Sequence, residues 1–222
     1  MENRLASLDW NRENPVTTRR TRYNLDTTHT DEELLELFRS THDNAWLEQL
    51  VYRYERDLYN YLRRFLGDSQ YAEDVFQATF LQIYLKADQF DTQRKFRPWL
   101  YMVATNQAID AQRRNKRHQH ASLQKNISAT ENFDGMSLLD IIPSEAPSPE
   151  ENLEIQERAK QIHEFVDTLP PPLRDVVLLI YYEGIKYREA AEILGLPVGT
   201  VKSRLHNAMK RIGQWLRNKN VT

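Results

Sequence analysis

The residues best suited to chemistry in this chain lie near its C-terminus, between Lys186 and Trp215. Six polar side chains there recur at helical spacing and share one wide helix face: Lys202, Ser203, His206, Asn207, Lys210 and Arg211. Such a face offers amide, hydroxyl and cationic donors, which can hydrogen-bond base edges in the major groove and pair with phosphates. The expected chemistry is therefore non-covalent recognition of DNA.

Two short amphipathic helices must position this face. Apolar residues keep the helical period on both sides of a Gly195-Leu196-Pro197 break, at Ala190, Ala191, Ile193, Leu194, Val201, Leu205, Ala208 and Ile212. Pro197 suits the first turn of the second helix, where its missing N–H costs nothing. This layout predicts a helix-turn-helix. A surface hairpin whose polar face is only solvated has the same pattern, so the rest of the chain must decide.

Composition sets wider limits. The chain has 222 residues, of which 40% are hydrophobic, enough for one large or two small globular domains. It has no cysteine, which excludes disulfides and thiolate metal sites. No apolar run approaches the ~20 residues needed to span a bilayer, and no signal-peptide core is present. We expect a cytoplasmic protein without membrane insertion.

The titratable residues disfavour an enzyme. His118 and His120 stand in a basic segment with no carboxylate constellation near them in sequence, and His163 stands by itself in a helical stretch. No nucleophile elbow, phosphate-binding loop or metal triad can be recognised. We therefore expect no catalytic residue, no metal and no cofactor.

Charge is segregated along the chain, although the net charge is only −2. Basic residues outnumber acidic ones in residues 94–117 and again in residues 186–219. Residues 131–157 between them contain acidic side chains but no Lys or Arg. The two basic stretches are where contacts with nucleic acid are expected.

Helical periodicity divides the chain in the same way. Residues 1–30 are expected to form a flexible extension, and residues 31–120 a domain of four helices. Asp43 and Gly67 are expected to bound the second helix of that domain, whose fourth helix should follow Pro98. The apolar stripe of the second helix is predicted to be Trp46, Leu50, Tyr54, Leu58, Tyr61, Leu62 and Phe65.

A second domain is predicted in residues 152–219, after a flexible acidic linker in residues 121–151. A helix after the prolines at 170–172 should support the helix-turn-helix. No β alternation is sustained enough for a sheet. The predicted fold is therefore all-α, with two helical domains joined by the linker.

Two motifs make the chain resemble a bacterial sigma factor of the extracytoplasmic-function (ECF) group, in the sigma-70 family. Residues 72–80 match the D-x-x-Q-x-x-F helix of that family, and Phe96-Arg97-Pro98-Trp99 follows. Residues 187–205 match its Y-x-E-A-A-x-x-L-G-x-P-x-G-T-V-K-S-R-L pattern. The resemblance covers roughly residues 31–217 and implies a transcription initiation factor, whose partners are promoter DNA and the beta-prime and beta subunits of core RNA polymerase. An anti-sigma factor is a further partner that the family suggests.

The resemblance assigns two functions to the first domain. Core polymerase binding falls on the second and third helices, with Glu73, Asp74, Gln77 and Leu81 on the third. Recognition and melting of the downstream (−10) element falls on the loop before the fourth helix and on that helix, at Arg94, Lys95, Phe96, Arg97, Asn106, Arg113, Arg114 and Arg117. A solvated helix face and plain core packing are the alternatives for these residues, and core packing applies above all to Phe80, Phe96 and Trp99.

Recognition of the upstream (−35) element falls on the helix-turn-helix. The resemblance places Lys202, Ser203, His206 and Asn207 near base edges, and it gives backbone contacts to Tyr187, Arg204, Lys210 and Arg211. One relative carries arginine where this chain has Asn207. Arginine pairs with guanine whereas asparagine prefers adenine, so the upstream sequence should differ.

Two other classes remain open. A stand-alone helix-turn-helix regulator would explain the second domain but should bind a duplex site as a dimer, and it leaves the D-x-x-Q-x-x-F helix unexplained. A helical adaptor without DNA contacts would explain the amphipathic helices but not the segregated basic charge.

Overall fold

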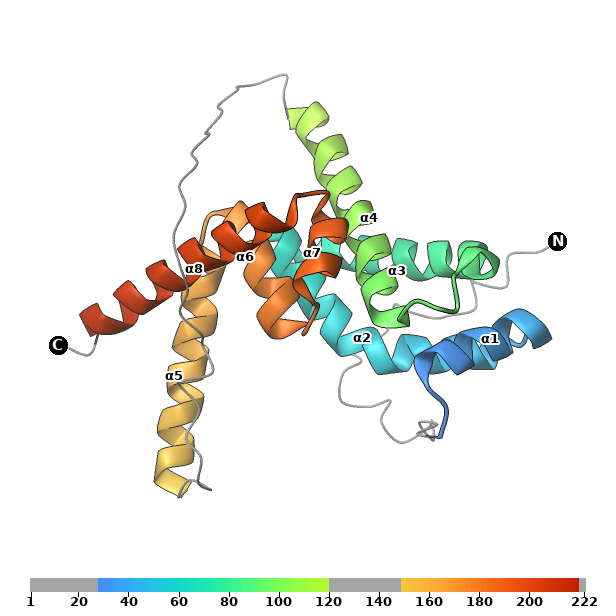
Figure 1. Cartoon of the computed structure of the whole chain (residues 1–222), viewed down its shortest axis with the longest axis horizontal. Helices are drawn as coiled ribbons and strands as arrows, with labels where there is room; N and C mark the ends of the chain where they lie inside the picture. The colour runs from blue at the N-terminus through green and yellow to red at the C-terminus, as the bar shows by residue number, and fades with distance from the viewer. Residues whose placement is uncertain (1–27, 120–148, 220–222) are drawn as a thin grey trace.

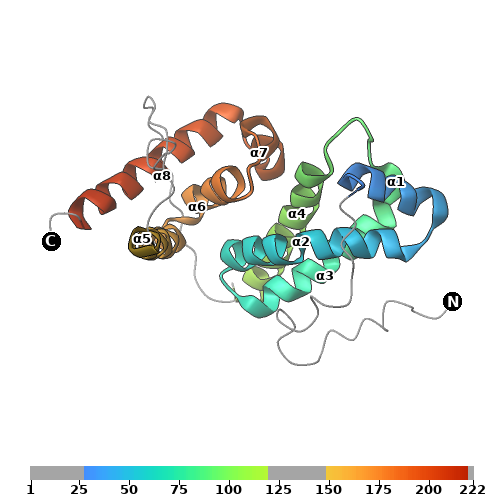
Figure 2. The ribbon, with the colours of Figure 1, turned by 90° about the horizontal axis from the view of Figure 1, so that it is seen from below.

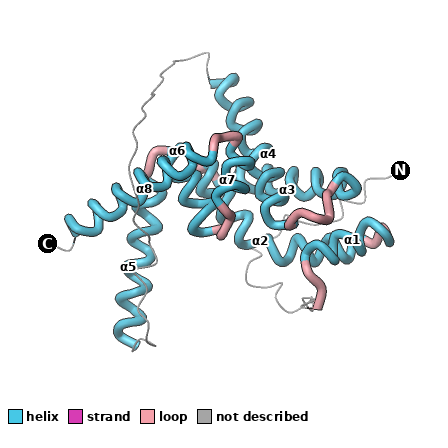
Figure 3. The backbone as a smooth tube through the Cα atoms, viewed as in Figure 1, coloured by secondary structure: helices cyan, strands magenta, loops and turns pink. Residues whose placement is uncertain are grey.

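The computed structural model of the chain describes residues 28–119 and 149–219. Within these ranges every regular element is helical and no strand occurs, which confirms the all-α prediction (Figure 3). The helices form two groups in space, α1–α4 and α5–α8, which Figure 2 shows on opposite sides of the molecule. Nearly all of the expected extension and linker lies outside the described residues. The last three residues predicted as linker, 149–151, belong to a helix.

The first group is a bundle in which α2 and α3 pack together and α4 packs on both (Figure 1). Its elements are α1 Asp31–Thr41, α2 Asn44–Leu66, α3 Ser69–Lys86, a 3-10 turn at Ala87–Gln89, and α4 Phe96–Gln119.

Side-chain caps begin three of these helices. The Asp43 carboxylate accepts the Ala45 N–H at 3.0 Å, and that of Asp68 accepts the Gln70 N–H at 2.8 Å. Thr30 and Glu33 form a reciprocal capping box at the start of α1. Gly67 ends α2 at φ 74°, a left-handed conformation that glycine adopts without steric cost. These local signals are therefore sufficient to predict where α2 begins and ends.

The core of this group differs from the prediction in two places. Leu47 is the first buried residue of the α2 stripe, whereas Trp46 is half-buried at the edge of the core, where its ring meets His29. The fourth helix begins at Phe96, two residues before Pro98, so the proline lies inside its first turn, where it breaks no hydrogen bond. Tyr61 and Tyr101 are completely buried and meet edge to face at 5.1 Å.

The second group is built on α8, which packs against α6 and α7. Its elements are α5 Pro149–Thr168, α6 Pro171–Val177, a π-helical turn at Leu178–Tyr182, α7 Tyr187–Leu194 and α8 Val198–Lys219. The supporting helix begins with prolines in its first turn, as expected, but it ends in a π-helical turn that periodicity does not predict. The helix α8 has 22 residues, so the second helix is not short as predicted. Ile212 is buried, as its place in the predicted stripe requires, and Trp215 stacks on Phe165 of α5 at 4.8 Å.

The two groups touch at two places. The start of α4 packs against α7, and the end of α2 packs against α6 (Figure 1). At the second place Arg64 lies 2.7 Å from Nδ1 of His163 and 4.8 Å from the ring centre of Tyr182. Arg174 donates to the carbonyl oxygen of Phe65 at 3.0 Å. His163, which stands by itself in the sequence, is thus a contact residue between the groups.

Candidate nucleic-acid interface

The helix-turn-helix geometry rests on a sharp turn between α7 and α8. Gly195 adopts φ 62°, and the N–H of Leu196 donates to the carbonyl oxygen of Ala191 at 2.9 Å, which closes the end of α7. Thr200 and Val201 both donate to the carbonyl oxygen of Pro197, so α8 starts directly after the proline. The predicted apolar stripes are buried on both helices except at Leu194, which is half-buried. These contacts fix which face of α8 points outward.

The predicted upstream-reading residues do share this outward face. Lys202, Lys210 and Arg211 are exposed, whereas Ser203, His206 and Asn207 are half-buried beside them. The Ser203 hydroxyl donates to the carbonyl oxygen of Thr200 at 3.0 Å, so its oxygen remains able to accept. The face therefore presents exposed cations interleaved with shorter hydrogen-bonding groups, a combination that suits both phosphate and base contacts.

Arg204 and Tyr187 stand apart from that face. Arg204 is half-buried and lies close enough to Asp175 of α6 to lower the pKa of that carboxyl, although burial has the larger effect and raises it to about 7. Tyr187, 41% exposed, begins α7. Arg204 is therefore part of the packing between α6 and α8, a role that its place in the sequence motif does not reveal.

The predicted downstream-reading residues do not lie on one face. Arg94, Lys95 and Asn106 are exposed, but the ring of Phe96 is completely buried. Phe96 contacts Tyr54 at 5.6 Å and Trp99 at 5.9 Å, so in this conformation it belongs to the core and cannot stack on a base. Arg113 and Arg114 lie further along α4 and are exposed. The side chain of Arg117 lies outside the described residues.

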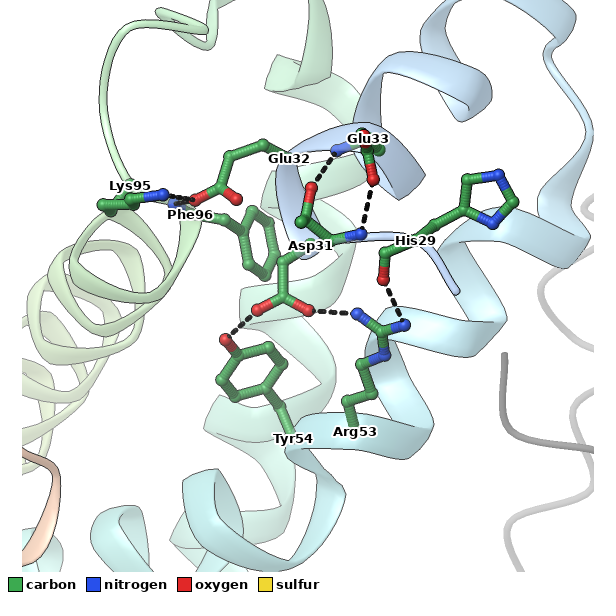
Figure 4. A network of polar contacts seen from close by, with 9 residues as sticks. His29, Asp31, Glu32, Glu33, Arg53, Tyr54, Lys95 and Phe96 are labelled. Atoms are coloured by element: carbon green, nitrogen blue, oxygen red, sulfur yellow. Dashed lines mark hydrogen bonds and ion pairs between the residues drawn. The ribbon is translucent and has the colours of Figure 1, made fainter. Parts of the chain in front are cut away.

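A cluster of polar contacts at the start of α1 positions the loop before α4 (Figure 4). The Asp31 carboxylate accepts from Arg53 at 2.6 Å and from the Tyr54 hydroxyl. Glu32 accepts the N–H of Phe96 at 2.9 Å and lies 3.8 Å from Nζ of Lys95. Burial and the neighbouring Asp31 raise the pKa of Tyr54 far above its ordinary value, so this hydroxyl stays a donor. One face of α1 thus holds the loop that carries Arg94 and Lys95.

The start of α4 also contacts the second group of helices, α5–α8. The sequence does not predict this contact. Arg97 donates from Nη2 to the Glu183 carboxylate and from Nε to the Glu183 carbonyl oxygen, both at 2.9 Å. The Tyr101 hydroxyl donates to the same carboxylate. No local signal could have revealed this site, because Arg97 and Glu183 are 86 positions apart in sequence.

The predicted polymerase-binding residues form an exposed face of α3. Glu73, Asp74 and Gln77 are exposed, and Leu81 is 43% exposed. Leu85, at 62%, and Tyr84, at 40%, extend the face with apolar area that the sequence analysis does not include. Large apolar side chains exposed together are typical of a protein–protein contact.

The described residues offer neither a metal-binding cluster nor a membrane-spanning helix. Residues 28–119 and 149–219 contain no cluster of three or more His, Asp or Glu side chains that could hold a metal ion. In the same part of the chain no helix is both long enough and apolar enough to cross a membrane.

Comparisons with known proteins agree with this arrangement. A model of sigma-70 region 2 matches residues 50–118, and a model of sigma-70 region 4 matches residues 159–212. The chain is 34% identical to the ECF RNA polymerase sigma factor SigW of Bacillus subtilis over 79% of its own length and 91% of that protein. It is 32% identical to the ECF RNA polymerase sigma-E factor of Salmonella typhimurium over 82% of its length and 92% of that protein.

A solved structure supports the fold. The sigma factor RpoE of Bartonella quintana, crystallised in complex with the anti-sigma factor NepR, matches with a TM-score of 0.54 at 20% identity. The match covers 77% of this chain and 96% of that one. The relatives, the two family models and the helix-turn-helix of α7 and α8 all indicate the same family. The chain therefore belongs to the ECF RNA polymerase sigma factors, and it is a promoter-directing transcription initiation factor rather than a stand-alone regulator.

Proposed function

We propose that the two helical groups of this chain bind a promoter at its upstream and downstream elements while α3 binds core RNA polymerase. The outward face of α8 reads the upstream element. The loop before α4 and the helix itself contact and open the downstream element. The chain acts by binding, in the cytoplasm of a bacterium, and supplies no catalytic group.

The observation that carries this proposal is the outward face of α8. Lys202, Lys210 and Arg211 are exposed beside the shorter, half-buried Ser203 and Asn207, on a helix whose other side is buried. The face thus offers cations for phosphates and hydrogen-bonding groups for base edges side by side. Contacts between such a face and the major groove give affinity through phosphates and sequence choice through bases.

For polymerase binding, the support is the exposed face of α3. Its apolar area at Leu81, Tyr84 and Leu85 offers packing, while Glu73 and Gln77 offer polar contacts at the edge. An anti-sigma factor is a further partner in this proposal, because RpoE of Bartonella quintana was solved in complex with the anti-sigma factor NepR. The downstream-reading role rests on Arg94, Lys95 and Asn106, together with Arg113 and Arg114 along α4.

Run-off transcription tests the proposal. Core RNA polymerase is incubated with the full chain and a template library in which both promoter elements are randomised, and the transcripts are sequenced. We expect discrete start sites that depend on the chain. Lys202→Ala should reduce the yield about tenfold or more, whereas Lys160→Ala, which removes an exposed cation from α5, should not. A chain that binds a duplex site as a dimer but does not bind core polymerase would contradict the proposal.

A further inference from the structure

The residues just before α4 do not supply the usual helix cap. A helix leaves its first N–H groups without partners, and a side-chain oxygen directly before it commonly accepts one of them. Arg94 and Lys95 precede Phe96, and both side chains have donors but no acceptor. Asp91, further back in the loop, uses its carboxylate on the Gln93 N–H at 3.0 Å. The acceptor for the start of α4 therefore comes from elsewhere in the chain.

Glu32 of α1 supplies this acceptor. Its carboxylate accepts the Phe96 N–H at 2.9 Å and lies 3.8 Å from Nζ of Lys95 (Figure 4). The partial positive charge at the start of a helix favours a carboxylate in this position. The Glu32 side chain is only 23% exposed, so water screens the contact less than it would on an open surface. A residue 64 positions away in sequence thus caps α4.

Glu32 can act as a fixed point because the first turn of α1 is itself anchored to α2. The neighbouring Asp31 accepts from Arg53 at 2.6 Å and from the Tyr54 hydroxyl. The Tyr54 ring in turn lies 5.6 Å from the ring of Phe96, between centres. Two adjacent carboxylates of α1 therefore join α2 to the start of α4.

The loop before α4 is held at both of its ends. At its start Phe90 is buried, and its ring centre lies 4.9 Å from that of Trp99. At its end Glu32 holds the Phe96 N–H. Residues 91–95 between these points are all exposed. A loop with fixed ends and an exposed middle loses less conformational entropy on binding than a loop that must first be ordered.

We propose that Glu32 is a positioning residue for opening the downstream element. By holding the start of α4, it keeps residues 91–95 in the conformation that receives an unpaired base, although Glu32 itself does not touch DNA. The inference rests on the proposed role of this loop in downstream recognition. Taking a base out of the stack is costly, so a loop that had to be ordered at the same time would open the promoter more slowly.

Amide hydrogen exchange, measured by NMR on the full chain, tests the contact without DNA or polymerase. Glu32→Ala should speed exchange of the Phe96 amide about fivefold, because this N–H loses its acceptor. Glu32→Gln should restore most of the protection, since its side-chain carbonyl oxygen can still accept. The matched control is Glu36→Ala, which removes an exposed carboxylate of the same helix that pairs with Arg39, and it should leave Phe96 unchanged.

Promoter opening tests the function. Core RNA polymerase with each protein is mixed with the strongest promoter recovered from the randomised template library, which carries a fluorescent adenine analogue in its downstream element. We expect Glu32→Ala to slow opening about fivefold at saturating polymerase. Glu32→Gln should stay within about twofold of the unsubstituted chain, and Glu36→Ala should equal it. Affinity for core polymerase, measured by fluorescence anisotropy of the labelled chain, and base preference in the upstream element should be the same in all four proteins.

Faster exchange at Phe96 and slower opening in Glu32→Ala, both recovered in Glu32→Gln, support the proposal. Unchanged exchange or unchanged opening in Glu32→Ala, no recovery in Glu32→Gln, or a parallel loss of affinity for core polymerase would overturn it. If the unsubstituted chain opens no promoter, the proposed function fails and this inference fails with it. A failure of the inference by itself leaves the unsubstituted chain active, so the two failures are distinguishable.

Discussion

Asn207 lies on the outward face of α8, half-buried beside the exposed Lys210 and Arg211. A side chain in this position is close enough to the helix axis to be oriented by its neighbours, and its amide can pair with adenine at two atoms. The exposed Lys202, Lys210 and Arg211 are longer, so they suit phosphates. Sequence choice therefore depends on few residues, and Asn207 is one of them.

Replacing Asn207 should change which promoter sequence is preferred rather than the level of transcription. We expect Asn207→Arg to shift base preference at one position of the upstream element by about 1–3 kcal/mol, toward guanine, because arginine contacts its O6 and N7 atoms. Sequenced transcripts from the randomised template library measure the shift. Lys210→Arg keeps the charge at the rim and serves as the control. The same base preference in both variants would show that Asn207 does not contact a base.

At the scale of the elements, the turn between α7 and α8 depends on backbone conformation more than on packing. Gly195 has φ 62°, and a Cβ at this position would meet no atom within 4 Å. Any cost of a side chain there comes from the left-handed backbone itself. Gly199, inside the first turn of α8, also has open space around it but an ordinary helical backbone.

This pair of glycines offers a matched test. Gly195→Ala should lower the free energy of unfolding by about 1 kcal/mol, because an L-residue is strained in the left-handed region. Gly199→Ala should leave stability unchanged or raise it by up to about 1 kcal/mol, since alanine is the better helix former. Urea denaturation followed by circular dichroism measures both. Equal effects would mean that the turn relaxes and that Gly195 is not required.

A second test at this scale concerns the packing of α6 on α8. Burial raises the pKa of Asp175 from 3.8 to about 7, even though Arg174 and Arg204 lower it. Between these two pH values the folded chain holds a proton that the unfolded chain has lost, so stability falls as pH rises through this window and is level above it. Asp175→Asn removes this proton. The variant should become more stable relative to the unsubstituted chain by about 4 kcal/mol as the pH rises from about 4 to about 8.

Thermal unfolding of the two proteins across this range checks the expectation. Other groups titrate here too, including Glu183 and His163, but they are common to both proteins and cancel in the difference. A constant difference between the proteins at all pH values would show that Asp175 has the same pKa in the folded and unfolded chains.

For the whole molecule, two separate anchors hold the groups together. Arg64 at the end of α2 contacts His163 and Tyr182, and Arg97 at the start of α4 contacts Glu183. Both anchors join residues of α1–α4 to residues of α5–α8. Because they act on one opening equilibrium, loss of both should have a larger effect than loss of either.

We therefore expect the double variant Arg64→Ala with Glu183→Gln to have a larger radius of gyration than either single variant. Small-angle X-ray scattering of the full chain measures it. Arg63→Ala, which removes the exposed neighbour of Arg64, is the control and should leave the radius unchanged. A double variant as compact as the unsubstituted chain would mean that other contacts hold the groups together.

The sequence by itself determined the helices and their outward faces. Asp43, Gly67 and Gly195 act on the backbone within a few residues, and the buried stripes of α7 and α8 follow from a period of 3.6 residues, so local pattern is enough. The family resemblance followed from the motifs in residues 72–80 and 187–205. Only the tertiary structure decided that Phe96 belongs to the core, that Arg204 faces Asp175, and that Arg97 binds Glu183. Each of these depends on how helices distant in sequence pack together, and helical periodicity carries no information about which distant partner a side chain meets.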